Sequence, residues 1–320
     1  MNVYLVRRLL YFVPTLFGAS LLIFALMRMV PGDIAEILVY QTGGETADVQ
    51  QREIQRIRRE LGLGRPLAVQ YLDWAVHALR GDFGYSYTQR RPVADILAER
   101  FPRSMELAVL TMCLAVAWAV PAGVLAALHH NRWVDRLVQV ASLGGLSIPL
   151  FVTGLLILYV LVRVFQWLPP LEFTAFLESP SENLKQMIWP ALAQAYYISA
   201  PIARLTRSQM LDVLHEDYVR TARAKGLAPL RVVFRHGLAN ALLPVVTFIA
   251  WWGGRMLGGV VIMESIFVVP GIGTALVQAV SYRDYPTVQA IVFVMALTFL
   301  IINLVIDLLY GWLDPRIRHA

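Results

Sequence analysis

Long apolar runs alternate with short polar stretches along most of this chain of 320 residues. Because a membrane-spanning helix needs about 20 mostly apolar residues, these runs predict six spans. They cover residues 9–27, 107–128, 137–162, 188–203, 241–263 and 288–306. The fourth run is the most polar of the six. We therefore expect an all-α integral membrane protein with six transmembrane helices and both termini on one side.

The polar segment 31–103, between the first two spans, has a helical periodicity of its own. Apolar residues recur at helical spacing over 49–61, and Gly62 then supplies a stop signal. The ranges 66–79 and 93–101 predict two further amphipathic helices, with the turn-rich loop RGDFGYSYTQRRP between them. The segment is thus expected to be a helical region outside the membrane.

Basic residues set the expected orientation, because cytoplasmic loops carry an excess of Lys and Arg. The loop 204–237 is strongly basic, and arginines flank the first span at positions 7 and 8 and follow the last span at 316 and 318. Both termini and this loop are therefore expected to face the cytoplasm. The alternative of an N-terminal signal peptide fits less well, because the first apolar run is long and no small-residue cleavage site precedes Pro31.

Composition supports a membrane protein. Hydrophobic residues make up 58% and charged residues 16% of the chain, against about 45–50% and 25% in ordinary soluble domains. The net charge of +6 is then explained by orientation rather than by nucleic-acid binding. The single cysteine, Cys113, excludes an intramolecular disulfide and is expected to be a small buried apolar residue.

The chain lacks the motifs of the common catalytic and nucleotide-binding sites. It contains neither a Gly-x-x-x-x-Gly-Lys-Ser/Thr phosphate loop nor a Gly-x-Ser-x-Gly elbow. Its histidines do not stand at metal-ligand spacing. We therefore predict no catalytic residue, no metal site and no cofactor in this chain. No carboxylate pair lies within a predicted span, which weighs against a proton-coupled carrier.

The stretch DYVRTARAKGLAPLRVVFRH, residues 217–236, is the most polar part of the second half of the chain. Lys225 suits a last helical turn, Gly226 suits a left-handed C-cap, and Pro229 suits the start of a second helix. The apolar faces of the two predicted helices are Leu211, Leu214, Tyr218 and Ala222, and Leu230, Val233, Phe234 and Leu238. A basic loop attracted to anionic lipid is the alternative interpretation.

The order of residues here carries a family resemblance. DYVRTARAKGL followed by RHGLANALLPVVT resembles the cytoplasmic coupling loop of ABC-importer permeases, in the B-type dipeptide, oligopeptide and nickel branch. RRLLYFVPTLFGASLLIFALMRMVPGD, ESIFVVPGIGTALVQAVSYRDYPTVQA and DLLYGWLDPRIR also fall in the order of that family. The family's Glu-Ala-Ala signature corresponds to Arg220-Thr221-Ala222, of which only Ala222 matches, so no glutamate-mediated contact is expected.

The resemblance implies a type I importer permease with four parts. They are 1–30 with the first span, the extracytoplasmic region 31–103, a five-span core 104–310 with the coupling loop 205–240, and a cytoplasmic tail 311–320. It also implies a bacterial-type inner membrane location. The implied partners are a homologous second permease subunit, two cytoplasmic ATPase subunits that bind ATP and Mg, and an extracytoplasmic substrate-binding protein.

The resemblance further implies that the loop 212–240 transmits ATP-driven motion from the ATPase. The expected contact residues are Asp217, Tyr218, Arg220, Thr221, Ala222, Ala224, Lys225 and Gly226. Di- or oligopeptides are the expected substrate, with nickel chelates, glutathione or another small solute as alternatives. A secondary transporter or a non-transporting membrane scaffold is a remote alternative.

Polar residues within the spans are candidates for a translocation path. A lipid-facing charge in mid-span costs at least about 2.5–3.5 kcal/mol, so Arg255 is expected to meet either a substrate carboxylate or an acid of the partner subunit. Tyr196, Tyr197 and Ser199 make the fourth span polar and are candidate lining residues. Pro149 and Pro201 are expected inside the third and fourth spans, where they would kink the helices.

Overall fold

The computed structural model describes residues 2–29, 36, 39, 47–60, 62–86, 88–170 and 172–313. The described residues are almost entirely helical, and their only strands form one short hairpin. They divide into two compact units, Met1–Pro102 with Gly271–Leu304 and Arg103–Pro270 with Val305–Ala320. The tail beyond Leu313, most of 31–46 and the basic side chains at 7, 316 and 318 lie outside the described part, so the predictions made for them stay predictions.

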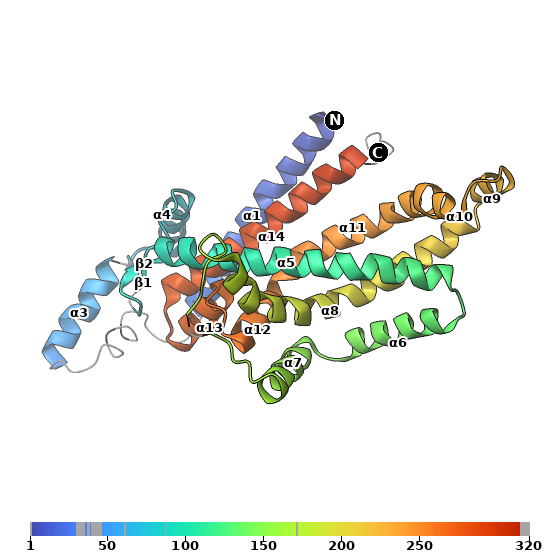
Figure 1. The fold of residues 1–320 in the computed structure, drawn as a ribbon. Helices are drawn as coiled ribbons and strands as arrows, with labels where there is room; N and C mark the ends of the chain where they lie inside the picture. Colours follow the sequence, from blue (N-terminus) through green and yellow to red (C-terminus); the bar gives the residue numbers. More distant parts are fainter. Residues whose placement is uncertain are drawn as a thin grey trace. The chain divides into compact units, whose positions relative to one another are not determined.

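The first unit contains short and long helices together with the hairpin (Figure 1). Its elements are α1 Asn2–Met29, α3 Ala47–Glu60, α4 Leu67–Leu79, β1 Tyr85–Ser86, β2 Arg91–Pro92, α13 Ile272–Ser281 and α14 Tyr285–Leu313. The helices predicted over 49–61 and 66–79 are confirmed as α3 and α4. The loop predicted between residues 80 and 92 instead contains the antiparallel pair β1–β2.

Aromatic packing joins α1, α4 and α14 in the first unit. Phe24 of α1 packs edge-on against Tyr71 of α4 with ring centroids 5.6 Å apart, and Trp74 packs against Phe293 of α14 at 5.4 Å. The hydroxyls of Ser20 and Tyr71 share a hydrogen bond of 2.7 Å. The tyrosine thereby buries its ring and still satisfies its polar group.

The second unit is a helical bundle arranged around one long helix (Figure 1). Its elements are α5 Val93–Leu128, which begins in the first unit, α6 Trp133–Ser147, α7 Leu150–Val164, α8 Pro180–Leu214, α9 Asp217–Ala224, α10 Pro229–Arg231, the π-helix η1 Val232–Leu238, α11 Ala239–Arg255 and α12 Leu257–Phe267. Helix α8 contacts α6, α7, α11 and α12. The bundle core is rich in alanines of α5 and α8, which allow these helices to approach closely.

Helix α8 explains why the fourth predicted span is weakly apolar. The predicted range 188–203 lies inside this helix of 35 residues, which is about 50 Å long at 1.5 Å per residue. Much of its surface is buried against other helices, including the side chains of Asn183, Gln194 and Thr206. A helix that is covered by protein rather than lipid does not need an apolar surface all round.

Length and hydropathy identify four described helices that can cross a membrane. They are Leu10–Met29, Val93–Leu128, Pro229–Arg255 and Tyr285–Ile306, and the number rises to six if each of two bent helix pairs is one span. The bent pairs are α6 with α7 and α12 with α13. The described part is thus a mostly helical membrane protein, as predicted, although α8 is not among the helices selected by hydropathy.

Three predicted helix boundaries are wrong. The third predicted span is two helices, α6 and α7, bent by 106°. Pro149 is the N-cap of α7 and does not lie inside a helix. Proline disfavours a helical conformation in the residue before it, and Ile148 is accordingly extended, at φ −85° and ψ 122°.

The other two boundaries concern α11 and α5. Helix α11 ends at Arg255, within a glycine-rich sequence, so 241–263 is not one helix. The predicted helix 93–101 is the first part of α5. Pro201 does lie inside α8.

Cys113 is exposed on α5, contrary to the prediction that it is buried. The apolar character of the run around it was interpreted as interior packing. In a membrane-spanning helix, however, an outward-facing residue is also apolar, because its surroundings are lipid or another subunit rather than water. Hydropathy alone therefore cannot place a small apolar residue on the inner or outer face of such a helix.

Close approach of α5 to α8 requires a glycine at position 123. A Cβ atom there would lie 2.6 Å from the carbonyl oxygen of Ala203 and 2.6 Å from Cβ of Thr206. We predict that Gly123→Ala lowers the melting temperature of the purified protein, because overpacking costs about 1–3 kcal/mol. The matched variant Gly258→Ala meets no atom within 4 Å and should not lower it. An unchanged or raised melting temperature for Gly123→Ala would contradict this packing.

Candidate functional site

The loop after α8 forms a short helix with a well-defined end. Helix α9 begins after the extended residue Glu216 and is followed by Gly226, whose φ is +75°. The amide of Leu227 donates to the carbonyl of Ala222 at 3.4 Å, and the amide of Gly226 donates to that of Arg223 at 3.0 Å. These two bonds are the Schellman pattern. The predicted glycine-capped helix end is therefore confirmed.

The buried face of α9 differs from the predicted one. Helix α8 ends at Leu214, so Leu211 and Leu214 do not continue onto the face of α9. Val219 and Ala222 are the buried residues of α9, and they pack against Val232 of η1 and Leu227. The prediction failed because nothing in the sequence LHED marks the helix break at residues 215–216. Ala222 therefore packs against the segment that follows α9 and does not lie on its exposed face.

Seven of the eight expected contact residues are exposed on α9 or at its C-terminal cap. Asp217, Tyr218, Arg220, Thr221, Ala224, Lys225 and Gly226 are all exposed. The Tyr218 hydroxyl donates to the carbonyl of His236 at 3.3 Å and accepts from the amide nitrogen of Asn240 at 2.8 Å. These bonds connect α9 to η1 and to the first turn of α11. The arginines Arg220 and Arg223 remain at the surface.

The segment after α9 is the beginning of a long helix and not a second short helix. It continues from Pro229 through η1 into α11. Of the predicted apolar face, only Val233 is buried, while Leu230 and Phe234 are 70% and 58% exposed. Sequence periodicity missed these exposed apolar residues because a π-helix has more residues per turn than the α-helix that the prediction assumed.

A cavity of about 470 Å³ lies between α7, α8, α11 and α12. Tyr197 and Arg255 line it, as do Gln194 and Trp252. Tyr196 does not line the cavity, and its hydroxyl donates to the carbonyl of Ala141 on α6 at 2.9 Å. Ser199 is buried, and its hydroxyl donates to the carbonyl of Tyr196 at 2.7 Å. The structure thus brings two of the four candidate path residues to one cavity.

Two polar side chains in this cavity have a buried atom without a partner in the described chain. The amide nitrogen of Gln194 donates to the carbonyl of Met256 at 2.9 Å, while its Oε1 is unpartnered, as is the indole Nε1 of Trp252. The guanidinium of Arg255 lies 4.6 Å from the ring centre of Trp251. Arg255 is therefore the charged residue of the cavity lining, and the two unpartnered atoms are buried in its wall. Sequence reasoning missed Gln194 and Trp252, which have no motif of their own.

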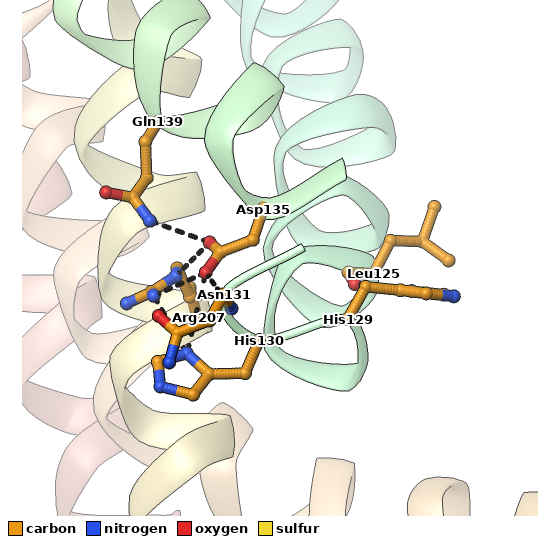
Figure 2. A network of polar contacts seen from close by, with 7 residues as sticks. All are labelled: Leu125, His129, His130, Asn131, Asp135, Gln139 and Arg207. Carbon is orange, nitrogen blue, oxygen red and sulfur yellow. Dashed lines mark hydrogen bonds and ion pairs between the residues drawn. The ribbon is translucent and has the colours of Figure 1, made fainter. Parts of the chain in front are cut away.

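A polar cluster fixes α6 against α8 (Figure 2). Arg207 of α8 binds Asp135 of α6 through two bonds, Nε to Oδ1 at 2.5 Å and Nη2 to Oδ2 at 2.8 Å. Gln139 donates to Oδ1 at 2.8 Å, and the amide of Asn131 donates to Oδ2 at 2.9 Å. Arg207 Nη2 also donates to His130 Nδ1 at 3.1 Å, so that nitrogen is an acceptor.

In the sequence, Arg207 is one of several basic residues of the loop 204–237, and no pattern distinguishes Asp135. The structure places the Asp135 side chain at 1% exposure and that of Arg207 at 20%. Bidentate geometry and two further donors satisfy the carboxylate fully. No sequence motif could have paired these residues, because they are 72 positions apart. They make a structural link between two helices.

The long apolar helices define a membrane protein. Residues 119–319 match the family described as binding-protein-dependent transport system inner membrane component. Residues 1–108 match its N-terminal membrane component family. The chain therefore belongs to the inner membrane permease subunits of binding-protein-dependent ABC importers. Membership implies a substrate-binding protein and ATPase partners.

Curated relatives share the whole length of the chain. It is 41% identical to the glutathione transport system permease protein GsiC of Escherichia coli (strain K12) over 316 residues, covering 99% of each chain. The identity to GsiC of Shigella flexneri serotype 5b (strain 8401) is 40% with the same coverage. A crystal structure of an amino acid ABC transporter with histidines matches at 19% identity and a TM-score of 0.48, covering 64% of this chain and 89% of that one.

The buried ion pair predicts an asymmetric response to mutation. Arg207→Met leaves the Asp135 carboxylate buried without its cation, so it should lower the free energy of unfolding by about 3 kcal/mol. The double variant Asp135→Leu/Arg207→Met should be more stable than Arg207→Met, because it leaves no unpaired charge. The exposed pair Arg220–Asp217, at 3.3 Å, is the control, and Arg220→Met should have little effect. A double variant less stable than Arg207→Met would contradict the assignment.

Proposed function

We propose that this permease subunit forms the translocation path for short peptides, glutathione included. The single observation that carries the proposal is Arg255, the charged residue among the described residues that line this cavity. Its guanidinium can donate hydrogen bonds to a carboxylate. Short peptides carry such a carboxylate at their C-terminus.

The named relatives support the same substrate class. GsiC is described as a glutathione transport system permease, and glutathione is itself a tripeptide. A cavity of about 470 Å³ lies within the range of about 300–1,000 Å³ that is usual for small-molecule sites. Aromatic rings cover part of the cavity wall, since Tyr197 packs edge-on against Trp252 at 5.7 Å. The site therefore combines an apolar wall with a few oriented polar groups.

We propose that the outer face of α9 contacts a cytoplasmic ATPase subunit. This face is exposed, is held by its buried side and a capped end, and presents Tyr218 together with Arg220 and Lys225. A short helix of this kind fits a groove on a partner protein. Leu230 and Phe234, exposed on the following turn, extend the contact with apolar surface. Arginines at the rim would pair with acidic residues of the ATPase.

In the full proposal, a homologous second permease subunit, two ATPase subunits and an extracytoplasmic binding protein complete the importer. The ATPase subunits bind ATP and Mg, and this chain contributes no cofactor site. Both termini and the loop 212–240 face the cytoplasm. The basic excess of that loop supports this orientation. The contact through α9 then transmits nucleotide-driven motion to α8 and the cavity.

The conformation of Gly226 provides a test of the coupling contact. A Cβ atom at this position would have no other atom within 4 Å, so Gly226→Val acts through backbone strain alone, because β-branched residues avoid positive φ. We predict that this variant loses most ATP-dependent uptake in vesicles while the partner ATPase still hydrolyses ATP. Ala228→Val is the control, because φ −57° and ψ 137° suit valine. Normal uptake and normal stimulation of hydrolysis in Gly226→Val would count against the contact.

The role of Arg255 is tested by uptake of matched substrates into vesicles that contain the complete importer. Arg255→Gln should reduce ATP-dependent uptake of glutathione and of an unmodified dipeptide by about tenfold or more, because a charge-assisted bond to the carboxylate is lost. Uptake of the C-terminally amidated dipeptide should change much less. Arg163→Gln is the control, since Arg163 is exposed on α7 and does not line the cavity.

Two results would contradict the proposal in different ways. If Arg255→Gln transports the unmodified dipeptide at the normal rate, Arg255 does not bind the substrate carboxylate. If the unmutated importer takes up neither peptides nor glutathione when ATP is supplied, the substrate class itself is wrong. The first result would leave the permease role and the contact through α9 unaffected.

A further inference from the structure

The outward surface of α6 begins with two cations and an indole ring. Arg132, the N-cap of α6, and Arg136 are both exposed and stand one helical turn apart. Trp133 lies beside them in the same turn and is 74% exposed. Residues four apart on a helix are neighbours on its surface. These three side chains form one patch, which we call the α6 basic patch.

Apolar side chains continue the same face of α6 after the patch. Leu137, Val140 and Leu143 are 60%, 67% and 54% exposed. They follow Trp133 at intervals of four, three and three residues, which places them on one side of a helix. Helices α6 and α7 together are long and apolar enough to be one membrane span. Exposed apolar residues on such a span face lipid or another subunit rather than water.

The opposite face of α6 is fixed to α8. Asp135 and Arg207 point toward each other and form the buried ion pair (Figure 2). Ten residues further along, a Cβ atom at Gly145 would lie 2.9 Å from that of Ala200. The amide of Asn131 donates to Asp135 at 2.9 Å and so fixes the loop before the helix. The rotation of α6 about its axis is therefore set, with the basic patch on the outside.

The charge of the basic patch is not neutralised within the chain. Asp135 is the only acidic residue in the sequence 129–147, and its buried carboxylate binds Arg207. Neither Arg132 nor Arg136 has an ion pair or a side-chain hydrogen bond in the described structure. Like charges one helical turn apart repel each other. An anion bound between the two guanidinium groups would relieve this repulsion.

The position of the basic patch indicates what kind of anion it meets. Tryptophan is enriched at the level of lipid headgroups, and arginine lays its stem along apolar surface while its charged end stays in the polar layer. A phospholipid with its phosphate at the patch has its acyl chains beside Leu137, Val140 and Leu143. One such molecule covers both parts of the face. A soluble phosphate would leave the apolar residues uncovered.

We propose that the α6 basic patch binds the headgroup of an anionic phospholipid whose acyl chains lie along Leu137, Val140 and Leu143. A zwitterionic lipid binds less well, because its ammonium group is repelled by the two arginines. The bound lipid holds the end of α6 that joins α8 through the Asp135–Arg207 pair. The contact does not depend on which substrate the permease transports.

The test measures lipid preference beside the apolar part of this face. A fluorophore is attached to Val140→Cys in a Cys113→Ser background, with reactive cysteines removed from the partner subunits. The complete importer is placed in phosphatidylcholine bilayers that contain increasing amounts of brominated phosphatidylglycerol or brominated phosphatidylcholine. Brominated acyl chains quench a fluorophore that they touch. We expect the affinity for phosphatidylglycerol to exceed that for phosphatidylcholine by about tenfold or more.

Charge-neutral variants locate the headgroup. Arg132→Gln and Arg136→Gln should each reduce the preference for phosphatidylglycerol by about fivefold, the factor that one arginine near a membrane surface contributes. The double variant should have almost no preference, whereas Arg136→Lys, which retains the charge, should keep most of it. Arg163→Gln is the control, since Arg163 is exposed on α7 and lies outside the patch. An unchanged melting temperature shows that each variant is folded.

Four outcomes would overturn the proposal. If neither brominated lipid quenches the fluorophore, another protein covers this face. Equal quenching by the two lipids in the unmutated importer would show that the patch does not select an anionic headgroup. If the preference survives in Arg132→Gln/Arg136→Gln, the headgroup is bound elsewhere. If that double variant releases the ATPase subunits while its lipid preference is unchanged, the arginines belong to the ATPase contact.

Discussion

The ion pair between Arg207 and Asp135 fixes the position of α8, and both candidate sites in the second unit depend on that helix. A buried carboxylate is stable only when its charge and lone pairs are satisfied. Here Arg207, Gln139 and Asn131 supply all of its donors. The pair holds the beginning of α6 to the α8 segment that precedes α9. If α9 moves together with α8, this motion must therefore either carry α6 along or break a buried ion pair.

The same helix carries the residues of the cavity. Gln194 and Tyr197 lie on α8, and only two residues separate the end of α8 from the start of α9. Gly123 of α5 and Gly145 of α6 both lie so close to α8 that a Cβ atom would overlap it, at 2.6 Å and 2.9 Å from the nearest atoms. Because closely packed interiors are not easily compressed, a displacement at one end of such a helix is transmitted to its other end. The proposed coupling contact and the cavity are then connected by one helix.

The sequence predicted those elements whose conformation depends mainly on neighbouring residues along the chain. Gly226 was identified as a left-handed cap because only a residue without a Cβ adopts this conformation readily. The helices α3 and α4 followed from their apolar periodicity and the turn signals beside them. By contrast, the sequence pattern placed Pro149 inside a span, since an apolar run on both sides of a proline does not reveal whether the helix kinks or ends there.

The features that could not be predicted all depend on contacts between distant residues. Asp135 and Arg207 are each ordinary in their own sequence context, and so are Gln194 and Trp252. Each pair becomes structurally important because the fold buries its two members close together, and the periodicity of the sequence does not encode such contacts. The break before α9 belongs to the same class, because Val219 and Ala222 are buried by Val232 and Leu227 of the following segment. The glycine-capped end of α9 was therefore located correctly along the chain, but the buried and exposed faces of this helix were not.

The central claim is that α8 and α9 move as one body when the importer binds ATP. The direct test is electron–electron distance spectroscopy between spin labels at Lys185, near the start of α8, and Arg223 on α9, in a Cys113→Ser background. Both positions are exposed, and Arg223 is not among the expected contact residues. The account predicts the same distance distribution in nucleotide-free and ATP-bound complexes that are competent for hydrolysis. A distribution that shifts or broadens on ATP binding would show that α9 moves independently of α8 and would contradict it.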